Sequence, residues 1–341
     1  MNINDLCFKL CEKAGTSGDE KIAAEYTKEL LDKFMTAEID RLGNVVGTMG
    51  DGKTHILLDA HLDSIGLVVR GIDEKGFLLV DRVGGMDERV LTGAEVIVHG
   101  KEELFGVICS VPPHLQKGDN KKELLNLKEM AVDIGFNKEE AEKRVEIGDR
   151  ITLRTHQAEL LGNNISSPSL DDRSCVAVIL RALELTENKI PSIKLTVLFS
   201  AQEETGGSGA KTAAFNAMPD YAIAVDVGFG NDPYTDKTQT VELSKGPSIG
   251  IAPILDREMM KELKELAVEE NIPYQHDVMS GRTGTNADHI NITGGGVKTA
   301  LLSLPLRYMH TGCEVVNTDD IENTARLIAA YLLKKEAECN A

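Results

Sequence analysis

Apolar residues near the start of the chain recur at the spacing of an amphipathic helix. Residues 3–13 carry them every three or four positions, which predicts a first helix. The glycine-containing residues 15–18 interrupt this pattern, and the pair Ser17 and Glu20 then predicts a capping box. A second amphipathic helix is expected to begin there and to end near Phe34.

Short strands are expected after these helices. Residues 38–42, 45–48 and 55–59 lie between Gly, Asn and Asp turns, which favours strands over helices. The apolar run at 56–60 is continuous rather than alternating. Such a run is typical of a strand that is buried on both faces of a sheet.

The pattern changes between residues 66 and 156, where short β-rich runs alternate with glycine turns. This alternation is typical of a small antiparallel barrel or sandwich. A helix is expected at 138–145, inside a charged segment. We therefore expect residues 66–160 to form a separate inserted β domain.

Strands alternate with helices again after about residue 162, and this pattern predicts a largely parallel sheet with helices on both faces. Thr318 is expected to cap a final helix. Residues 1–65 and 161–341 would then form one α/β domain, interrupted by the insertion. The other elements expected in this part are helices at 174–186, 207–215 and 257–270 and strands at 193–199, 221–225 and 296–303.

Composition narrows the functional classes. The chain has 341 residues, a formal net charge of −18 and a 42% hydrophobic content, so it can bury a core but has no basic excess for nucleic acid or anionic lipid. No apolar run approaches the roughly 20 residues that span a bilayer. Without a recognisable signal peptide or a Cys-x-x-Cys pair, its six cysteines are expected to be reduced thiols of a cytoplasmic protein.

Candidate chemistry lies where the predicted strands end, because ligands of open α/β sheets bind at the carboxyl ends of the strands. His61 and Asp63 follow the run at 56–60; His61 suits a metal ion, and Asp63 could orient its imidazole. Taken alone, a histidine at a strand end is more often a structural hydrogen-bonding residue. Asp226 and His310, which end two later strands, are equally weak signals one at a time.

Two acidic pairs add to this pattern. Asp171 and Asp172 precede a helix, where carboxylates can simply cap the helix, or can bridge two cations. Glu203 and Glu204 follow the strand at 193–199, just before a glycine turn. An acidic pair at the end of a buried strand is costly without partners, and a metal site provides them if one Glu is a ligand and the other a general base.

Taken together, the polar residues at the strand ends are stronger evidence for a metal site than any one of them alone. Two histidines and three carboxylates suit two divalent ions such as zinc, cobalt or manganese, with one aspartate shared between them. The sequence lacks a Walker motif, a dinucleotide-binding glycine motif and a Gly-x-Ser-x-Gly motif. The set consists of His61, Asp171, Glu204, Asp226 and His310.

These segments resemble the glutamyl aminopeptidase or tetrahedral (TET) aminopeptidase family of dinuclear metallopeptidases. The resemblance follows the family's order over essentially the whole chain. It is carried by residues 60–66, 170–173, 202–206, 225–227 and 307–310, with 111–114 and 133–135 in the insertion.

The resemblance implies a role for each site residue. His61 and Asp226 would hold one metal ion, Glu204 and His310 the other, and Asp171 would bridge the two. In the same family pattern Glu203 is the general base and Asp63 orients His61. The activity implied is removal of N-terminal residues from peptides.

The family also implies an assembly: the inserted β domain would form dimers, and dimers would build a hollow twelve-subunit tetrahedron. Two single residues depart from the family pattern, and residues 296–299 lack the Arg and the Pro-Thr pair that members tend to carry there. Cys175 stands where Gly is usual, and Asn286 stands where Asp is typical. The change at 286 is expected to affect specificity rather than activity.

Two other functions remain open on the sequence. The same site could belong to a dinuclear deacylase or amidohydrolase that acts on blocked peptides. Alternatively, the chain could be a non-catalytic assembly protein that binds peptides. The full set of candidate ligands argues against the second alternative.

Overall fold

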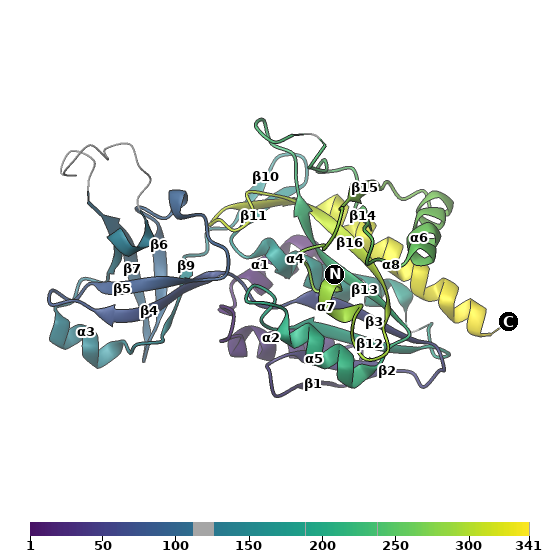
Figure 1. Ribbon diagram of the computed structural model, residues 1–341, viewed down its shortest axis with the longest axis horizontal. Coiled ribbons are helices and arrows are strands. Elements are labelled where there is room, and N and C mark those ends of the chain that lie inside the picture. Colours follow the sequence, from purple (N-terminus) through teal and green to yellow (C-terminus); the bar gives the residue numbers. More distant parts are fainter. Residues whose placement is uncertain (112–125, 188, 237, 341) are drawn as a thin grey trace.

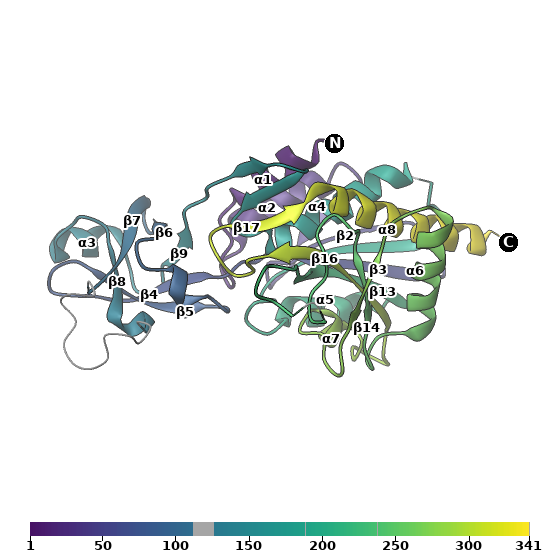
Figure 2. The ribbon, with the colours of Figure 1, turned by 90° about the horizontal axis from the view of Figure 1, so that it is seen from above.

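A computed structural model describes residues 1–111, 126–187, 189–236 and 238–340. Figures 1 and 2 show a β-barrel beside a larger α/β body, with the C-terminal helix α8 (Thr318–Cys339) at the far end of that body. Most of the segment at 111–114 that resembles the aminopeptidase family lies outside the described residues.

Four parallel strands form the centre of the sheet in the α/β body. β3 (His55–His61) lies between β12 (Lys194–Ser200) and β13 (Tyr221–Phe229), and β16 (Lys298–Arg307) pairs with β13. All four run in one direction, so their carboxyl ends meet at one edge of the sheet. The mixed, largely parallel sheet that the sequence predicts is therefore confirmed.

Antiparallel strands extend this sheet on both sides. Among the described residues it has eleven strands, and β14 and β15 branch off β16. These additional strands are β1 (Ala37–Ile39), β2 (Val45–Met49), β10 (Ala158–Leu160), β11 (Asn164–Ser167), β14 (Ser248–Ile251), β15 (Gln275–Val278) and β17 (Glu314–Asn317).

Helices cover both faces of the sheet, which explains the continuous apolar run in β3. Ile56 and Leu58 belong to the core beneath α4 (Leu170–Thr186) and α8, whereas Leu57 points to the opposite face and packs against α5 (Ser208–Ala217). Every residue of β3 is buried. The remaining helices are α1 (Ile3–Cys11), α2 (Lys21–Leu31), α6 (Arg257–Glu269) and the short α7 (Ala287–Ile290).

The barrel is built from antiparallel strands with a core of their own. Burial alternates along β6, as expected for strands with one face toward a barrel interior. The short helix α3 (Lys138–Arg144) lies close to the expected 138–145. The strands, which close in the order β4-β5-β8-β7-β6-β9, are β4 (Gly66–Ile72), β5 (Leu78–Val83), β6 (Glu95–His99), β7 (Glu103–Ser110), β8 (Met130–Asp133) and β9 (Arg150–Leu153).

Two predicted helix caps are wrong. The carboxylate of Glu20 accepts hydrogen bonds from the backbone N–H groups of Gly18 and Gln202, and Ser17 contacts another loop, so no capping box forms. At the start of α8 the cap is Asn317, whose side chain accepts from the N–H of Asp319, and Thr318 is already helical. Partners distant in sequence engage Ser17 and Glu20, whereas at α8 the neighbouring residue Asn317 is the cap.

Several predicted ends also shift. The second helix stops at Leu31 rather than near Phe34, and α4 begins at Leu170, four residues before the expected start. None of the helices in the described ranges has the length and apolar composition to cross a membrane.

Candidate metal centre

The candidate ligands converge at the carboxyl edge of the parallel strands. His61 is the last residue of β3, and its register partner in β12 is Ser200. Glu203 and Glu204 follow directly in the turn after β12. Asp226 lies near the end of β13, Asp171 lies at the start of α4, and His310 lies three residues beyond β16.

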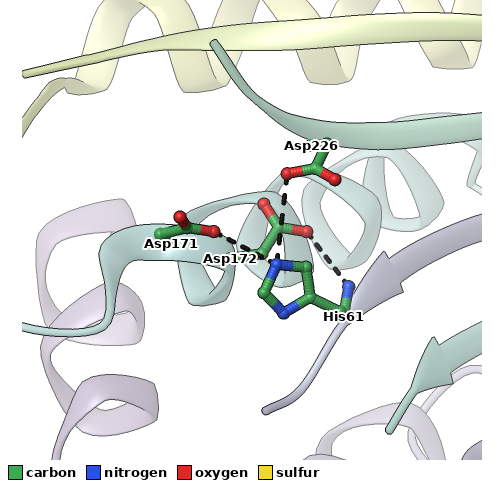
Figure 3. Close-up of side chains that lie close together, drawn as sticks. All are labelled: His61, Asp171, Asp172 and Asp226. Carbon is green, nitrogen blue, oxygen red and sulfur yellow. Dashed lines mark hydrogen bonds and ion pairs between the residues drawn. The ribbon is translucent and has the colours of Figure 1, made fainter. Parts of the chain in front are cut away.

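His61 is at the centre of a first group of donors (Figure 3). Its Nε2 lies 3.1 Å from Oδ1 of Asp171 and 4.0 Å from Oδ1 of Asp226. Its backbone N–H donates to Oδ2 of Asp172 at 3.0 Å. All four residues are buried, so this group is shielded from bulk water.

His310 forms a second group with the other oxygen of Asp171. Nε2 of His310 lies 3.3 Å from Oδ2 of Asp171 and 3.2 Å from Oε1 of Glu204. Asp171 therefore directs one carboxylate oxygen toward each imidazole.

The donor atoms of each group lie within 4.8 Å of one another, close enough to surround a single ion. Asp171 belongs to both groups, which is the arrangement that a carboxylate shared by two ions requires. All five residues that the sequence singles out as ligands are brought together. The two groups are His61, Asp171, Asp172 and Asp226, and Asp171, Glu204 and His310.

The charges of this centre fit cations. Its carboxylates outnumber its imidazoles, and burial makes their ionised forms costly. Burial, with the neighbouring charges of Glu204 and Asp63, raises the pKa of Glu203 to about 7. Burial, together with the charge of Asp172, also raises the pKa of Asp226 well above its usual value. Divalent ions that prefer nitrogen and oxygen ligands would balance this excess.

The imidazoles show the same shortage of positive charge. Burial by itself lowers the pKa of His310, but its hydrogen bonds to Asp171 and Glu204 prevail and raise that pKa to about 11. The protonated imidazoles thus supply positive charge that bound metal ions would otherwise supply. The nitrogen and oxygen donors and their excess of negative charge therefore fit a divalent-metal site.

Glu203 lines the cavity beside the ligands, and among the described residues its carboxylate has no hydrogen-bond partner. Asp63 holds this turn: its two carboxylate oxygens accept the backbone N–H groups of Glu203 at 2.9 Å and of Glu204 at 3.1 Å. Nδ1 of His61 lies 3.0 Å from the backbone carbonyl oxygen of Asp63 and 3.5 Å from its carboxylate. Asp63 therefore contacts His61 mainly through its carbonyl group.

Sequence reasoning missed Glu314, the first residue of β17. Its carboxylate accepts the backbone N–H of Asp171 at 3.1 Å and the backbone N–H of His310 at 2.9 Å. It is buried and belongs to neither donor group, and it fixes the two segments that carry the candidate ligands Asp171 and His310. Its position four residues after His310 was the available signal.

Asp172, for which the sequence leaves open a helix cap or a cation-bridging carboxylate, also belongs to the first donor group. Its side chain is fully buried against the backbone of His61. Burial raises its pKa well above the usual value. Cys175, one of the departures from the family pattern, is buried, and the charge of Asp172 contributes, after burial, to raising the pKa of its thiol.

Asn286, the other departure, lies behind the centre. Its amide donates to Oδ2 of Asp59 at 2.9 Å and to Oγ of Ser200 at 2.8 Å. All three side chains are buried. The amide thus hydrogen-bonds one oxygen of a buried carboxylate inside β3, and Asn286 is not among the cavity-lining residues.

Comparison with known proteins finds similarity to aminopeptidases. A family described as M42 glutamyl aminopeptidase matches residues 43–327. A lysyl aminopeptidase of Pyrococcus furiosus is 33% identical over 342 residues, which cover 96% of each protein.

Solved structures agree with this match. An aminopeptidase from Desulfurococcus kamchatkensis superposes with a TM-score of 0.90 at 34% identity, over 97% of this chain and 94% of that one. The TET1 peptidase of Pyrococcus horikoshii superposes with a TM-score of 0.87 at 32% identity, over 97% of this chain and 99% of that one. That peptidase can assemble into a tetrahedron or a large octahedral shell.

Proposed function

Because the chain belongs to the M42 glutamyl aminopeptidase family and is a metal-dependent aminopeptidase, we propose that two divalent metal ions serve its active site. The observation that carries this proposal is the pair of donor groups that share Asp171. His61 and Asp226 would hold one ion, Glu204 and His310 would hold the other, and Asp171 would contribute an oxygen to each. Zinc or cobalt suits these nitrogen and oxygen donors, as does manganese.

The chain's own residues supply the remaining chemistry. Ions bound here would contribute Lewis acidity, which polarises a peptide carbonyl and makes water more acidic. Glu203 faces the cavity, and its carboxylate has no hydrogen-bond partner in the described ranges, so it can take a proton from the attacking water and return it to the leaving amine. Asp63 keeps Glu203 and Glu204 in place through their backbone N–H groups.

Replacement of Glu203 by Gln tests this role. General acid–base groups contribute about 10²–10⁴-fold to rate, so Glu203→Gln should lower kcat by at least about 100-fold while metal content stays normal. Glu29→Gln, an exposed change of the same kind on α2, should leave kcat unaltered. A Glu203→Gln enzyme with near-normal kcat would remove Glu203 from the mechanism.

The alternatives are less well supported. A deacylase would need blocked peptides, and a peptide-binding assembly protein would need no catalytic centre, whereas family and relatives are aminopeptidases. A panel of free and N-acetylated peptides, assayed with each metal added to the apo-protein, separates these activities. Cleavage of acetylated peptides alone would favour the deacylase.

We also propose a homo-oligomer in which residues 66–160 form an inserted dimerisation domain between the two parts of the catalytic domain, 1–65 and 161–341. Support comes from the separate core of the barrel and from the TET1 peptidase, which assembles into closed shells. Dimers could then build a dodecamer. Light scattering tests this directly, since a monomer has a mass of 37.0 kDa.

A further inference from the structure

The cavity at the metal centre has a volume of about 460 Å³ and reaches well beyond the ligands. Its other wall comes from β15 and from the loop that follows, at residues 283–285. A substrate whose scissile carbonyl lies at the metal centre must place its N-terminal side chain somewhere in this space. The chemistry of that wall therefore bears on which N-terminal residue is accepted.

Strand register places Asp277 on the ligand side of the sheet. Asp277 pairs with Gly250 of β14, and Ser248, two residues earlier in β14, pairs with Ser303 of β16. Ser303 in turn pairs with the ligand Asp226. Register partners and residues two apart project from the same face of a sheet, so Asp277 points to the side of Asp226. Figure 1 shows β14 and β15 next to β16.

The Asp277 carboxylate has no counter-charge. It is partly buried, and burial raises its pKa above the usual value. In the described part of the chain it forms neither an ion pair nor a side-chain hydrogen bond, and no Lys or Arg of that part lines the cavity. Arg282, the nearest cationic residue along the chain, is exposed and lies outside the lining.

An apolar surface lies beside this carboxylate. Met279 and Leu301 both line the cavity, and they pack in one cluster with Ala224 and Ala287. A long cationic side chain buries its methylene groups on an apolar wall and keeps its charged end at a polar group. The cavity therefore offers both an apolar surface, at Met279 and Leu301, and a carboxylate, at Asp277.

We propose that Asp277 is a specificity-determining residue that selects substrates with an N-terminal lysine or arginine, an inference that rests on the proposed aminopeptidase function. The apolar wall receives the side-chain methylenes, and the Asp277 carboxylate receives the ammonium or guanidinium. A substrate with an acidic N-terminal residue would face the carboxylate with like charge and be rejected.

The test compares substrates that differ only at the end of the first side chain. Lysyl and norleucyl p-nitroanilides share their methylene stem, and only the first carries the cation. In the metal-loaded full chain, Asp277→Asn should lower kcat/KM for the lysyl substrate by at least about tenfold and change it for the norleucyl substrate by less than about twofold. Asp277→Lys should move the preference toward a glutamyl substrate.

Controls separate this inference from general effects. Glu242→Gln removes an exposed carboxylate whose backbone hydrogen-bonds to Gln275 of β15, and it should alter kcat/KM for neither substrate. An equal loss on both substrates in Asp277→Asn would mean that Asp277 binds the free α-amine, and this outcome overturns the inference. Equal kcat/KM for lysyl, leucyl and glutamyl substrates in the unaltered chain would overturn it as well.

A binding measurement distinguishes failure of the inference from failure of the proposed function. Lysinamide and norleucinamide are titrated into the unaltered chain and into Asp277→Asn by calorimetry. Weaker lysinamide binding in the variant, with norleucinamide unchanged, supports the inference even if no peptide is cleaved. Cleavage without any effect of Asp277 leaves the aminopeptidase function standing and overturns the inference alone.

Discussion

At the scale of single residues, the candidate centre depends on acids outside its two donor groups. Glu314 accepts the backbone N–H groups of Asp171 and His310, so one carboxylate sets the positions of two candidate ligands that lie far apart in sequence. Such supporting residues orient ligands before the ion arrives, which lowers the cost of binding. Loss of one should therefore weaken metal binding more than it slows chemistry.

Replacement of Glu314 by Gln tests this distinction. The amide keeps one acceptor oxygen and loses the other, so one ligand segment becomes less well held. Apparent metal affinity should fall by roughly 10–100-fold, as for other residues that support ligands. At saturating metal kcat should return to within a few-fold of the original. Metal titration of the apo-protein measures both, and a low kcat that metal does not restore would place Glu314 in the chemistry.

At the scale of elements, the turn between β12 and α5 depends on close backbone contact. A Cβ atom at Gly209 would lie 2.2 Å from the carbonyl oxygen of Ala201 and 2.2 Å from Oδ1 of Asn44, so it would overlap with both. Asn44 also accepts the N–H of Ala201 at 2.8 Å. The helix thus begins directly against the strand end, which confines Glu203 and Glu204 to a short turn.

The change Gly209→Ala should disturb this contact. Overpacking against backbone costs roughly 1–3 kcal/mol, so Tm should fall and kcat should fall with it as the Glu203 turn moves. Lys211→Ala, an exposed change on the same helix, should alter neither quantity. A Gly209→Ala chain with unchanged Tm and kcat would show that the turn can shift freely.

Helix α8 is fixed to the sheet by an acid near its C-terminal end. The Glu336 carboxylate accepts the backbone N–H groups of Ser192 and Ile193, just before β12. Burial by itself raises the pKa of Glu336, but these hydrogen bonds lower it below its usual value. A carboxylate with a lowered pKa stabilises the fold at neutral pH and loses that contribution as the pH falls.

The expected pH dependence follows from this sign. Glu336→Gln should have a lower Tm than the unaltered chain at pH 7, and the difference should shrink below about pH 4.5, where an unfolded-state glutamate takes up its proton. Glu338→Gln, an exposed change two residues away, provides the matched control. A Tm difference that stays constant down to pH 3 would mean that Glu336 acts through packing and not through charge.

At the scale of the whole molecule, the sequence predicts those features of the fold and the site that depend on the local order of apolar and polar residues. The buried strands and the polar residues at their ends follow from hydrophobic runs, and parallel strands bring those ends to one edge. The roles of Glu314 and Asn286 depend on contacts across more than a hundred residues, as with the bonds from Asn286 to Asp59 and from Asp171 to Glu314. The false cap at Glu20 failed for the same reason, because Gln202 competes for its carboxylate.

The same long-range convergence makes ion binding a property of the whole fold. The candidate ligands run from His61 to His310 and come from segments that meet only when the α/β sheet is complete. An ion that binds the folded chain alone stabilises it by about 2.7 kcal/mol when its concentration is 100 times Kd. Removal of the ions also leaves buried carboxylates without compensating charge.

Chelation should therefore lower Tm and abolish peptide cleavage together, and added zinc, cobalt or manganese should restore both. Chelation should change the Tm of Asp171→Asn much less than the Tm of the unaltered chain. The substitution removes one carboxylate oxygen from the residue that contributes to both donor groups, so the variant should bind the ions weakly. Differential scanning calorimetry with and without chelator, alongside elemental analysis, makes the comparison. If chelation removes activity but leaves Tm unchanged, the ions do not bind the folded chain more tightly than the unfolded chain, and the predicted coupling of ion binding to folding is wrong.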